Sequence, residues 1–273
     1  MQTISQSMTQ TVVNADRGMN EIICGNCVDV TKGFADSSID LTVTSPPYDN
    51  LRDYKGYTFD FEGIARELYR VTAPGGVVVW NVADATVDGS ETGTSFTQAL
   101  FFKGLGFRIH DTMIYAKQNP MPLNSNRYEN AFEYMFVFGK GKLRTFNPIM
   151  EKSKTAGITN HGTYYKPDGT MVKKHGSGRV VKDEKVRSNI WTYPIGHNAE
   201  IPGHPATFPE ALARDHIISW SNEGDTVLDP MCGSGTTCKM AHNLKRNYIG
   251  IDISDEYCKI ARERLQGQSQ VLL

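Results

Sequence analysis

The sequence has no long apolar run, no marked excess of charge of either sign and few cysteines. Its 273 residues contain 29 Lys and Arg against 30 Asp and Glu, a formal net charge of −1, and 39% are hydrophobic. No stretch approaches the ~20 apolar residues that span a bilayer, and Met1–Gln6 lacks the apolar core of a secretion signal. These absences exclude fibrous and wholly disordered proteins and predict a cytoplasmic globular protein. Taken alone, the even charge balance argues against a nucleic-acid partner.

The five cysteines, in a chain without a signal peptide, predict reduced thiols. Cys24 and Cys27 have the CxxC spacing of some redox and zinc sites. A structural zinc usually needs a second ligand pair, and Cys232 and Cys238 stand six residues apart around a glycine-rich stretch. The sequence therefore predicts no metal site.

Short apolar runs alternate with amphipathic stretches, which predicts repeated β–α units and an α/β fold. Strands are predicted at 39–44, 77–80, 132–138, 226–229 and 248–251, and helices at 61–71, 96–105 and 207–220. Pro74–Gly76 is predicted to turn the chain into the strand that follows it. Thr207 and Glu210 are spaced like a capping box. The polar residues 1–20 are predicted to form a flexible arm, and 266–273 a C-terminal tail.

Residues 140–189 differ from the rest of the chain. They contain twelve Lys or Arg but only four Asp or Glu, and apolar residues are sparse among them. Such a segment is either a solvated insertion or a surface for an anionic partner. The net charge of the whole chain therefore averages a basic segment with an acidic remainder.

The stretch Asp229–Thr237, hereafter the glycine loop, lies between a predicted strand and a predicted helix. Its glycines let the backbone turn sharply and approach a ligand, while helix N–H groups point at that ligand. Asp252 follows the next strand, 23 residues after Asp229. A carboxylate at about this spacing along the sequence binds ribose hydroxyls in nucleotide-binding folds. The dinucleotide pattern GxGxxG is incomplete, because Cys238 stands three residues after Gly235. The loop favours a cofactor with an adenosine but no phosphates, and a structural glycine turn is the alternative.

A second motif, Ser45–Tyr48, follows the predicted strand 39–44. Its two prolines fix φ and lack N–H donors, so their carbonyl groups remain available as acceptors beside the Ser45 hydroxyl. This arrangement suits a ligand that presents an amino group, with Tyr48 stacking on the attached ring. A rigid turn with a packed tyrosine is the alternative for this motif alone.

Together the two motifs resemble those of the amino-methylating DNA methyltransferases, which modify N4 of cytosine or N6 of adenine. Ser45–Tyr48 matches their (S/N/D)PP(Y/F) catalytic motif, and the glycine loop matches their S-adenosylmethionine loop. His204–Pro209 is similar to the segment that precedes this loop in the family. The catalytic motif comes first here, as in the permuted β group, and the resemblance covers roughly residues 21–265.

The resemblance implies a Rossmann-like methyltransferase fold, with a catalytic domain at 21–139 and 190–265 and a target-recognition region inserted at 140–189. It implies S-adenosylmethionine as cofactor, double-stranded DNA as substrate and a target base flipped out of the helix. It also suggests a cognate restriction endonuclease as a partner.

The residues that the resemblance implies for the site fall into three groups. The catalytic group is Ser45, Pro46, Pro47 and Tyr48. The cofactor group is Asn26, Cys27, His204, Pro205, Asp229, Met231, Gly233, Ser234, Gly235, Thr236 and Asp252. The phosphate-contacting group is Arg52, Lys152, Lys154, Lys173, Lys174, Arg179 and Lys182. Relatives commonly carry Asp where this chain has Asn26, and an ion pair with Asp49 or Asp53 is the alternative for Arg52.

Several functions compete. Ser at the first catalytic position is more often met in N4-cytosine enzymes, so Ser45 favours cytosine N4, with adenine N6 as the alternative. A nicotinamide-dependent oxidoreductase is disfavoured by the incomplete GxGxxG pattern. An inactive DNA-binding module is disfavoured by the intact Ser45, Tyr48 and Asp252. Nothing in the sequence separates a monomer from a dimer.

Overall fold

The computed structural model describes residues 19–47, 59–120, 122, 126–195 and 209–269. These residues form two compact units. The larger unit comprises the described residues up to Asn147 and those from Asn189 onward, and the smaller unit is Pro148–Ser188. Most of the predicted N-terminal arm lies outside the described residues. Among those described, no helix is both long and apolar enough to cross a membrane.

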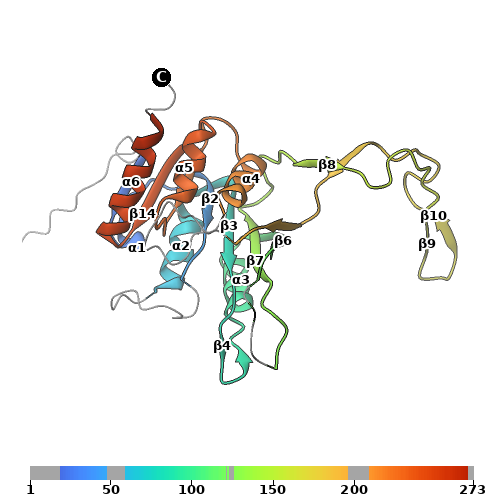
Figure 1. The fold of residues 1–273 in the computed structure, drawn as a ribbon, viewed down its shortest axis with the longest axis horizontal. Coiled ribbons are helices and arrows are strands. Elements are labelled where there is room, and N and C mark those ends of the chain that lie inside the picture. The colour runs from blue at the N-terminus through green and yellow to red at the C-terminus, as the bar shows by residue number, and fades with distance from the viewer. Residues whose placement is uncertain (1–18, 48–58, 121, 123–125, 196–208, 270–273) are drawn as a thin grey trace, which may run out of the picture. The chain divides into compact units, whose positions relative to one another are not determined.

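The larger unit is built on a mixed eight-stranded sheet (Figure 1), in the order β1-β14-β13-β2-β3-β7-β6-β12. Only β7 runs antiparallel to its neighbours in this sheet. The strands are β1 (Glu21–Cys24), β2 (Ile39–Thr44), β3 (Thr72–Val82), β6 (Arg108–Lys117), β7 (Phe132–Gly139), β12 (Ile190–Tyr193), β13 (Thr226–Asp229) and β14 (Asn247–Asp252). A small hairpin of β4 (Thr86–Val87) and β5 (Ser90–Glu91) lies beyond β3. The predicted Rossmann-like α/β fold is confirmed.

Helices cover both faces of the sheet. They are α1 (Cys27–Thr31), α2 (Phe61–Val71), α3 (Thr94–Leu105), α4 (Glu210–Trp220), α5 (Thr236–Asn243) and α6 (Asp255–Ser269). On one face, α1, α2 and α3 enclose an apolar core around Trp80, Phe102 and Phe138. On the other face, α4 packs on β2 and β3, α5 on β13 and β14, and α6 on β1 and α5. Helix α6 continues through Ser269, four residues into the predicted tail.

Most elements predicted from apolar patterning are confirmed. Strands β2 and β13 and helix α2 have the predicted bounds, and α3 begins two residues earlier than predicted. Helix α5 begins at Thr236, as expected for a chain that must first pass Gly235, whose φ is +80°. Strand β6 was not predicted, because its side chains alternate between exposed and half-buried over its first half and give no continuous apolar run.

Two local predictions are wrong. Pro74–Gly76 does not turn the chain into a strand, because β3 already begins at Thr72. The register jumps from Ile39↔Thr72 to Leu41↔Val77, so these residues form an irregularity within β3, and the Gly75 N–H donates to the carbonyl of Lys140 at 2.7 Å. The capping box also fails: α4 begins at Glu210 after Pro209, and no side chain caps it. Thr207 lies outside the described residues.

The smaller unit consists of two antiparallel strand pairs without a core. Strand β8 (Met150–Lys152) pairs with β11 (Glu184–Val186), and β9 (Thr163–Tyr165) pairs with β10 (Met171–Lys173). The structure describes every residue of Pro148–Ser188, and none of them is buried. Backbone hydrogen bonds rather than apolar packing therefore hold this unit together, and such ribbons are marginally stable alone.

The smaller unit is shorter than the basic segment at 140–189. Lys140 and Arg144 belong to the larger unit, where Lys140 Nζ donates to the carbonyls of Tyr69 (2.7 Å) and Thr72 (2.8 Å). Arg144 pairs with Asp40. These cations stabilise the fold of the larger unit and are not part of the smaller unit.

Candidate active site

The two motifs singled out in the sequence meet at one edge of the sheet. Strands β2, β13 and β14 are parallel neighbours, so their carboxyl ends lie together, which is where α/β sheets bind ligands. Ser45 follows β2, the glycine loop begins at the end of β13, and Asp252 ends β14. The fold thus brings together residues that are almost 200 positions apart.

Buried Asp229 links the two motifs directly. Its Oδ1 accepts a hydrogen bond from Thr44 Oγ1 at 2.8 Å and another from the Met231 N–H at 3.2 Å. Thr44 immediately precedes Ser45, and the Thr237 hydroxyl donates to the Val43 carbonyl at 3.1 Å. These bonds fix the end of β2 against the glycine loop. Burial raises the pKa of Asp229 to about 6, although its hydrogen bonds oppose that rise.

Asp229→Asn is expected to change how stability depends on pH. The folded-state pKa of Asp229 is raised above the unfolded value near 4, so its contribution to stability is complete below about pH 4 and is lost as the pH rises through about 6. The loss is about 3 kcal/mol, at ~1.4 kcal/mol per pKa unit. Asn does not titrate, so the melting temperature of D229N relative to the wild type should increase between pH 4 and pH 7. Thermal melts of both proteins across this pH range measure this change. A difference in melting temperature that stays constant with pH would contradict the prediction.

Two backbone N–H groups bind the carboxylate of Asp252. Its Oδ2 accepts from the Gly233 N–H at 2.8 Å and its Oδ1 from the Ser254 N–H at 2.9 Å. Burial raises the pKa of Asp252, whereas the N–H donors lower it. The carboxylate is half-buried and lies beside the glycine loop. It both holds the turn at Gly233 and keeps an exposed part at the edge of the sheet.

The glycine loop needs its glycine at position 235. Gly235 has φ +80°, and a Cβ there would lie 2.9 Å from the Cβ of Ala261 in α6. A larger residue would therefore be strained and would push α6 away. Ser234 and Thr236, on either side of Gly235, are 1% and 4% exposed. Their side chains are turned into the protein, and Met231 and Gly233 are the two residues of this loop that are only half-buried.

The remaining parts of the Ser45–Tyr48 motif are only partly described. Pro46 is buried, and Ser45 and Pro47 are half-buried. Tyr48 lies outside the described residues, as do Arg52, His204 and Pro205. Their predicted roles remain predictions.

Asn26 and Cys27 lie next to Asp252. Cys24 pairs with Asp252 in the β1–β14 register, and the Gly25 N–H donates to the Asp252 carbonyl at 2.9 Å. The Asn26 side chain caps α1, accepting from the N–H of Val28 at 2.9 Å. Burial raises the pKa of Cys27 to about 11, so its thiol is protonated at neutral pH and is a poor nucleophile.

A small cleft lies beside Cys27. It is lined by Cys27, Thr31, Ile64, Glu67, Leu68 and Pro230. The walls come from α1, α2 and the start of the glycine loop, and most of them are apolar. The space is too small to hold a water molecule, so these side chains pack against one another here.

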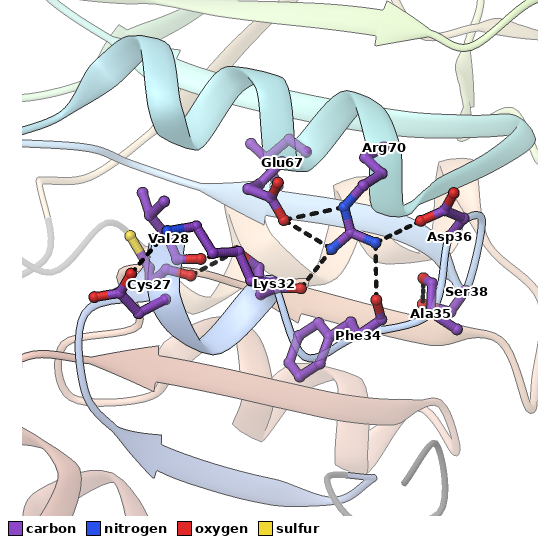
Figure 2. Close-up of polar contacts among 12 residues, drawn as sticks. Cys27, Val28, Lys32, Phe34, Ala35, Asp36, Ser38, Glu67 and Arg70 are labelled. Carbon is purple, nitrogen blue, oxygen red and sulfur yellow. Dashed lines mark hydrogen bonds and ion pairs between the residues drawn. The ribbon is translucent and has the colours of Figure 1, made fainter. Parts of the chain in front are cut away.

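Arg70 holds α1 in place beside this cleft (Figure 2). Its Nη2 donates to the Thr31 carbonyl at 2.6 Å, and its Nη1 donates to the Phe34 carbonyl at 2.8 Å. Its guanidinium also pairs with Glu67 at 2.7 Å and with Asp36 at 2.6 Å. The guanidinium thus satisfies carbonyl groups at the end of the short helix, and α2 fixes its position. Sequence reasoning missed this residue, because nothing local marks it.

A polar cluster at the end of β3 was also missed. Glu133 Oε2 accepts from Asn81 Nδ2 at 2.7 Å, and Glu133 Oε1 pairs with Lys117 Nζ at 3.1 Å. The pairing Thr44↔Trp80 places Asn81 one position further along, level with Ser45. Polar residues inside the apolar runs of β3 and β7 were the available signal, since buried polar groups cost free energy unless they are paired.

The six lysines and arginines predicted in the insertion are all exposed in the smaller unit. They are Lys152, Lys154, Lys173, Lys174, Arg179 and Lys182. Among the described residues, no group of three or more His, Cys, Asp or Glu side chains could hold a metal ion. The cysteines within the described ranges are free thiols.

Comparisons with known proteins identify relatives that match most of this chain. The orphan methyltransferase M.BamHII of Bacillus amyloliquefaciens is 55% identical over 243 residues, which cover 86% of this chain and 91% of that protein. The solved complex of M1.HpyAVI with S-adenosylmethionine is 26% identical, has a TM-score of 0.60 and covers 90% of this chain and 98% of that one. The cytosine-N4-specific PvuII DNA methyltransferase has a TM-score of 0.66 and covers 92% and 90%, but its 17% identity shows a shared fold alone.

The match to a protein family covers most of the chain. Residues 39–263 match the N6/N4 methyltransferase family, described as DNA methylases. That range includes the end of β2, the glycine loop and Asp252. The chain therefore belongs to the family of N6/N4 DNA methylases.

Proposed function

We propose that this DNA methyltransferase transfers the methyl group of S-adenosylmethionine to N4 of cytosine in double-stranded DNA. The observation that carries the proposal is the hydrogen bond from Thr44 to Asp229, which sets Ser45 and Pro46 beside the glycine loop. Membership of the N6/N4 family supports an exocyclic amino nitrogen as the methyl acceptor. Ser at position 45 favours cytosine over adenine.

The residues at the sheet edge fit the cofactor. Asp252 is proposed to offer carboxylate oxygens to ribose hydroxyls, with Asn26 and Cys27 beside it on the side of the adenine. The glycine loop presents backbone to the methionine portion, close to Asp229 and Met231. When bound, the sulfonium supplies an electrophilic methyl group.

Ser45 and Pro46 prepare the acceptor nitrogen. The lone pair of an exocyclic amine is delocalised into its ring, so the amine is a weak nucleophile. The Ser45 Oγ and the Pro46 carbonyl accept hydrogen bonds from its two N–H groups. These bonds favour a pyramidal nitrogen whose lone pair points at the methyl carbon. The nitrogen would bond to the methyl carbon as the carbon–sulfur bond breaks, the thioether would leave with that electron pair, and the methylated nitrogen would release its proton to solvent. No enzyme nucleophile is required, consistent with the protonated thiol of Cys27.

The target base must leave the DNA stack to reach this edge. Enzymes that modify a base inside a duplex flip it into a pocket, at a cost of a few kcal/mol. Tyr48 is proposed to stack on the flipped ring. Asn81, level with Ser45 and held by Glu133, is positioned to line the same pocket.

The smaller unit is proposed to bind the DNA backbone and to recognise the target sequence. Within Pro148–Ser188 there are nine Lys or Arg against four Asp or Glu, and six of these cations are the exposed residues named above. Charges of this kind contact phosphates and displace counterions. The absence of a core leaves most side chains of this unit accessible to a partner.

Replacing both Lys173 and Lys174 by alanine is expected to weaken DNA binding and its dependence on salt. Each lost phosphate contact lowers the slope of log K against log salt by about 0.9, so the double variant should lose up to about 1.8. Lys185→Ala is the matched control, because Lys185 Nζ is paired with Glu151 Oε1 at 2.9 Å. Fluorescence anisotropy across a salt series measures the slopes. Equal slopes for the wild type and the double variant would remove these lysines from the interface.

Two titrations test the proposed function. Calorimetry should detect binding of S-adenosylmethionine and none of NAD, and a labelled methyl group should appear in DNA. Binding of NAD alone would instead support an oxidoreductase. Binding of DNA without methyl transfer would support an inactive DNA-binding module. Methylation of adenine N6 is the main alternative, because Ser45 and Pro46 can accept hydrogen bonds from the amino group of either base.

A cognate restriction endonuclease is proposed as a partner of this enzyme. The Type II methyltransferase M.HpaI of Haemophilus parainfluenzae is 28% identical over 90% of this chain, whereas M.BamHII is named an orphan. Cell extracts that cut unmethylated DNA but spare DNA modified by this enzyme would support a partner. Extracts that cut neither would favour an orphan.

A further inference from the structure

Arg264 of α6 contacts the glycine loop at Ser234. Its Nη1 donates to the Ser234 carbonyl oxygen at 2.6 Å and to the Ser234 hydroxyl at 3.0 Å. The same nitrogen lies 3.5 Å from Thr236 Oγ1. The Arg264 side chain is 13% exposed. A guanidinium with several donors in a fixed fork thus binds Ser234 through both its carbonyl and its hydroxyl.

Glu210 completes the cluster. Its Oε1 accepts from Arg264 Nη2 at 2.8 Å and from Lys239 Nζ at 2.7 Å. Glu210 begins α4 and Lys239 lies in α5, so one carboxylate oxygen joins three helices around the loop. The Lys239 side chain is 12% exposed and that of Glu210 32%. This shelter from solvent makes the pairs stronger than ion pairs on an open surface.

The loop needs such a support because of its sequence. Ser234 stands between Gly233 and Gly235, whose φ angles are +50° and +80°. Glycines lose more conformational freedom on ordering than any other residue. Without a fixed partner for Ser234, the free-energy cost of ordering the loop would be paid when the cofactor binds.

We propose that Arg264, braced by Glu210, is a positioning residue that preorganises the glycine loop for S-adenosylmethionine. The inference rests on the proposed function and assigns Ser234 a different part from the predicted one, because its hydroxyl and carbonyl bind Arg264. The contacts of Arg264 are with Ser234, Thr236 and Glu210, so its proposed action on the cofactor is indirect. It stands one residue beyond the 39–263 segment that matches the family.

The experiment compares Arg264→Ala, Arg264→Lys and Arg262→Ala in the full chain. Arg262 is the matched control, because it lies on the same helix but donates to the Ile22 carbonyl at 2.8 Å and not to the loop. Calorimetric titration with S-adenosylmethionine gives affinity, steady-state methylation gives KM and kcat, and thermal melting gives stability.

Arg264→Ala should weaken cofactor binding at least tenfold and raise the KM for S-adenosylmethionine by a similar factor. The kcat at saturating cofactor and the KM for DNA should change less than twofold, since Ser45 is untouched. Arg264→Lys should recover part of the affinity, because an ammonium donates to fewer acceptors than a guanidinium. Arg262→Ala should leave the affinity unchanged even if its melting temperature falls as much.

Unchanged cofactor affinity in Arg264→Ala would overturn the proposal, as would an equal loss in Arg262→Ala. If Arg264→Ala does not fold, Arg264→Lys and Glu210→Gln carry the test: a loss of affinity in both folded variants supports the proposal, and wild-type affinity in both overturns it. Failure of the proposed function is recognised separately, because the wild-type chain itself would then not bind S-adenosylmethionine.

Discussion

Ser45→Ala is expected to lose most methyl transfer while S-adenosylmethionine still binds with wild-type affinity. The hydroxyl of Ser45 is proposed to accept one N–H of the target amine as its nitrogen becomes pyramidal. Removal of one preorganised hydrogen bond to a transition state typically lowers kcat by about 100- to 1000-fold. The neighbouring bond from Thr44 to Asp229 remains in the variant, so the end of β2 and the glycine loop keep their positions. Single-turnover transfer of a labelled methyl group measures the loss.

Ser38→Ala is the matched control for this prediction. Ser38 lies just before β2, and its Oγ donates to the Ala35 carbonyl at 2.7 Å, away from the sheet edge (Figure 2). This variant should keep its turnover within about twofold, as surface changes of this kind cost little. Wild-type turnover in Ser45→Ala would remove Ser45 from the mechanism. Equal losses in both variants would point to folding and not to catalysis.

Asp252→Ala is expected to lose cofactor affinity by about 100-fold. Each hydrogen bond to a charged group contributes about 1.5–3 kcal/mol, and this carboxylate is proposed to bind the ribose while it holds the Gly233 N–H at 2.8 Å. The variant therefore loses a ligand contact and one support of the loop. Calorimetric titration with S-adenosylmethionine measures the affinity directly.

Two further variants separate these contributions. Asp255→Ala, on the exposed first turn of α6, should bind the cofactor as the wild type does. Asp252→Asn keeps one acceptor for a backbone N–H but loses the negative charge, so its affinity should lie between those of Asp252→Ala and the wild type. Wild-type affinity in Asp252→Ala would show that the ribose binds elsewhere.

The sequence predicted those parts of the site that are local motifs. Asp229–Thr237 carries its own turn chemistry, and α5 starts where the glycines end. The apolar run 77–80 likewise forms the centre of β3. Patterns of this length reflect the physics of a single strand, turn or helix, so they can be read from the residues of that segment.

Residues that act across the fold were not predicted. Arg264 contacts Ser234, thirty residues earlier in the sequence, and Glu133 of β7 accepts a hydrogen bond from Asn81 of the neighbouring strand β3. Such contacts depend on which elements pack together, and a single sequence does not show this. The same reason explains the error at Pro74–Gly76, where hydrogen bonds from residues 140–144 hold an irregular stretch inside the sheet.

The charge balance shows the same division between local and global information. The net charge of −1 conceals a basic segment, as the sequence indicated. The structure narrows that segment to Pro148–Ser188, because Lys140 and Arg144 satisfy carbonyl and carboxylate groups of the larger unit. Basic residues near the boundary thus stabilise the fold, and the six exposed cations named above in the smaller unit are the ones proposed to contact DNA.

The most direct test of the central claim is mass analysis of nucleosides from DNA methylated by the purified enzyme with labelled S-adenosylmethionine. The choice of cytosine, which rests on Ser at position 45, predicts N4-methylcytosine as the labelled product. N6-methyladenine as the sole product would contradict the choice of base while retaining amino-group transfer. Label in 5-methylcytosine, or none in DNA, would contradict the amino-methylation mechanism itself.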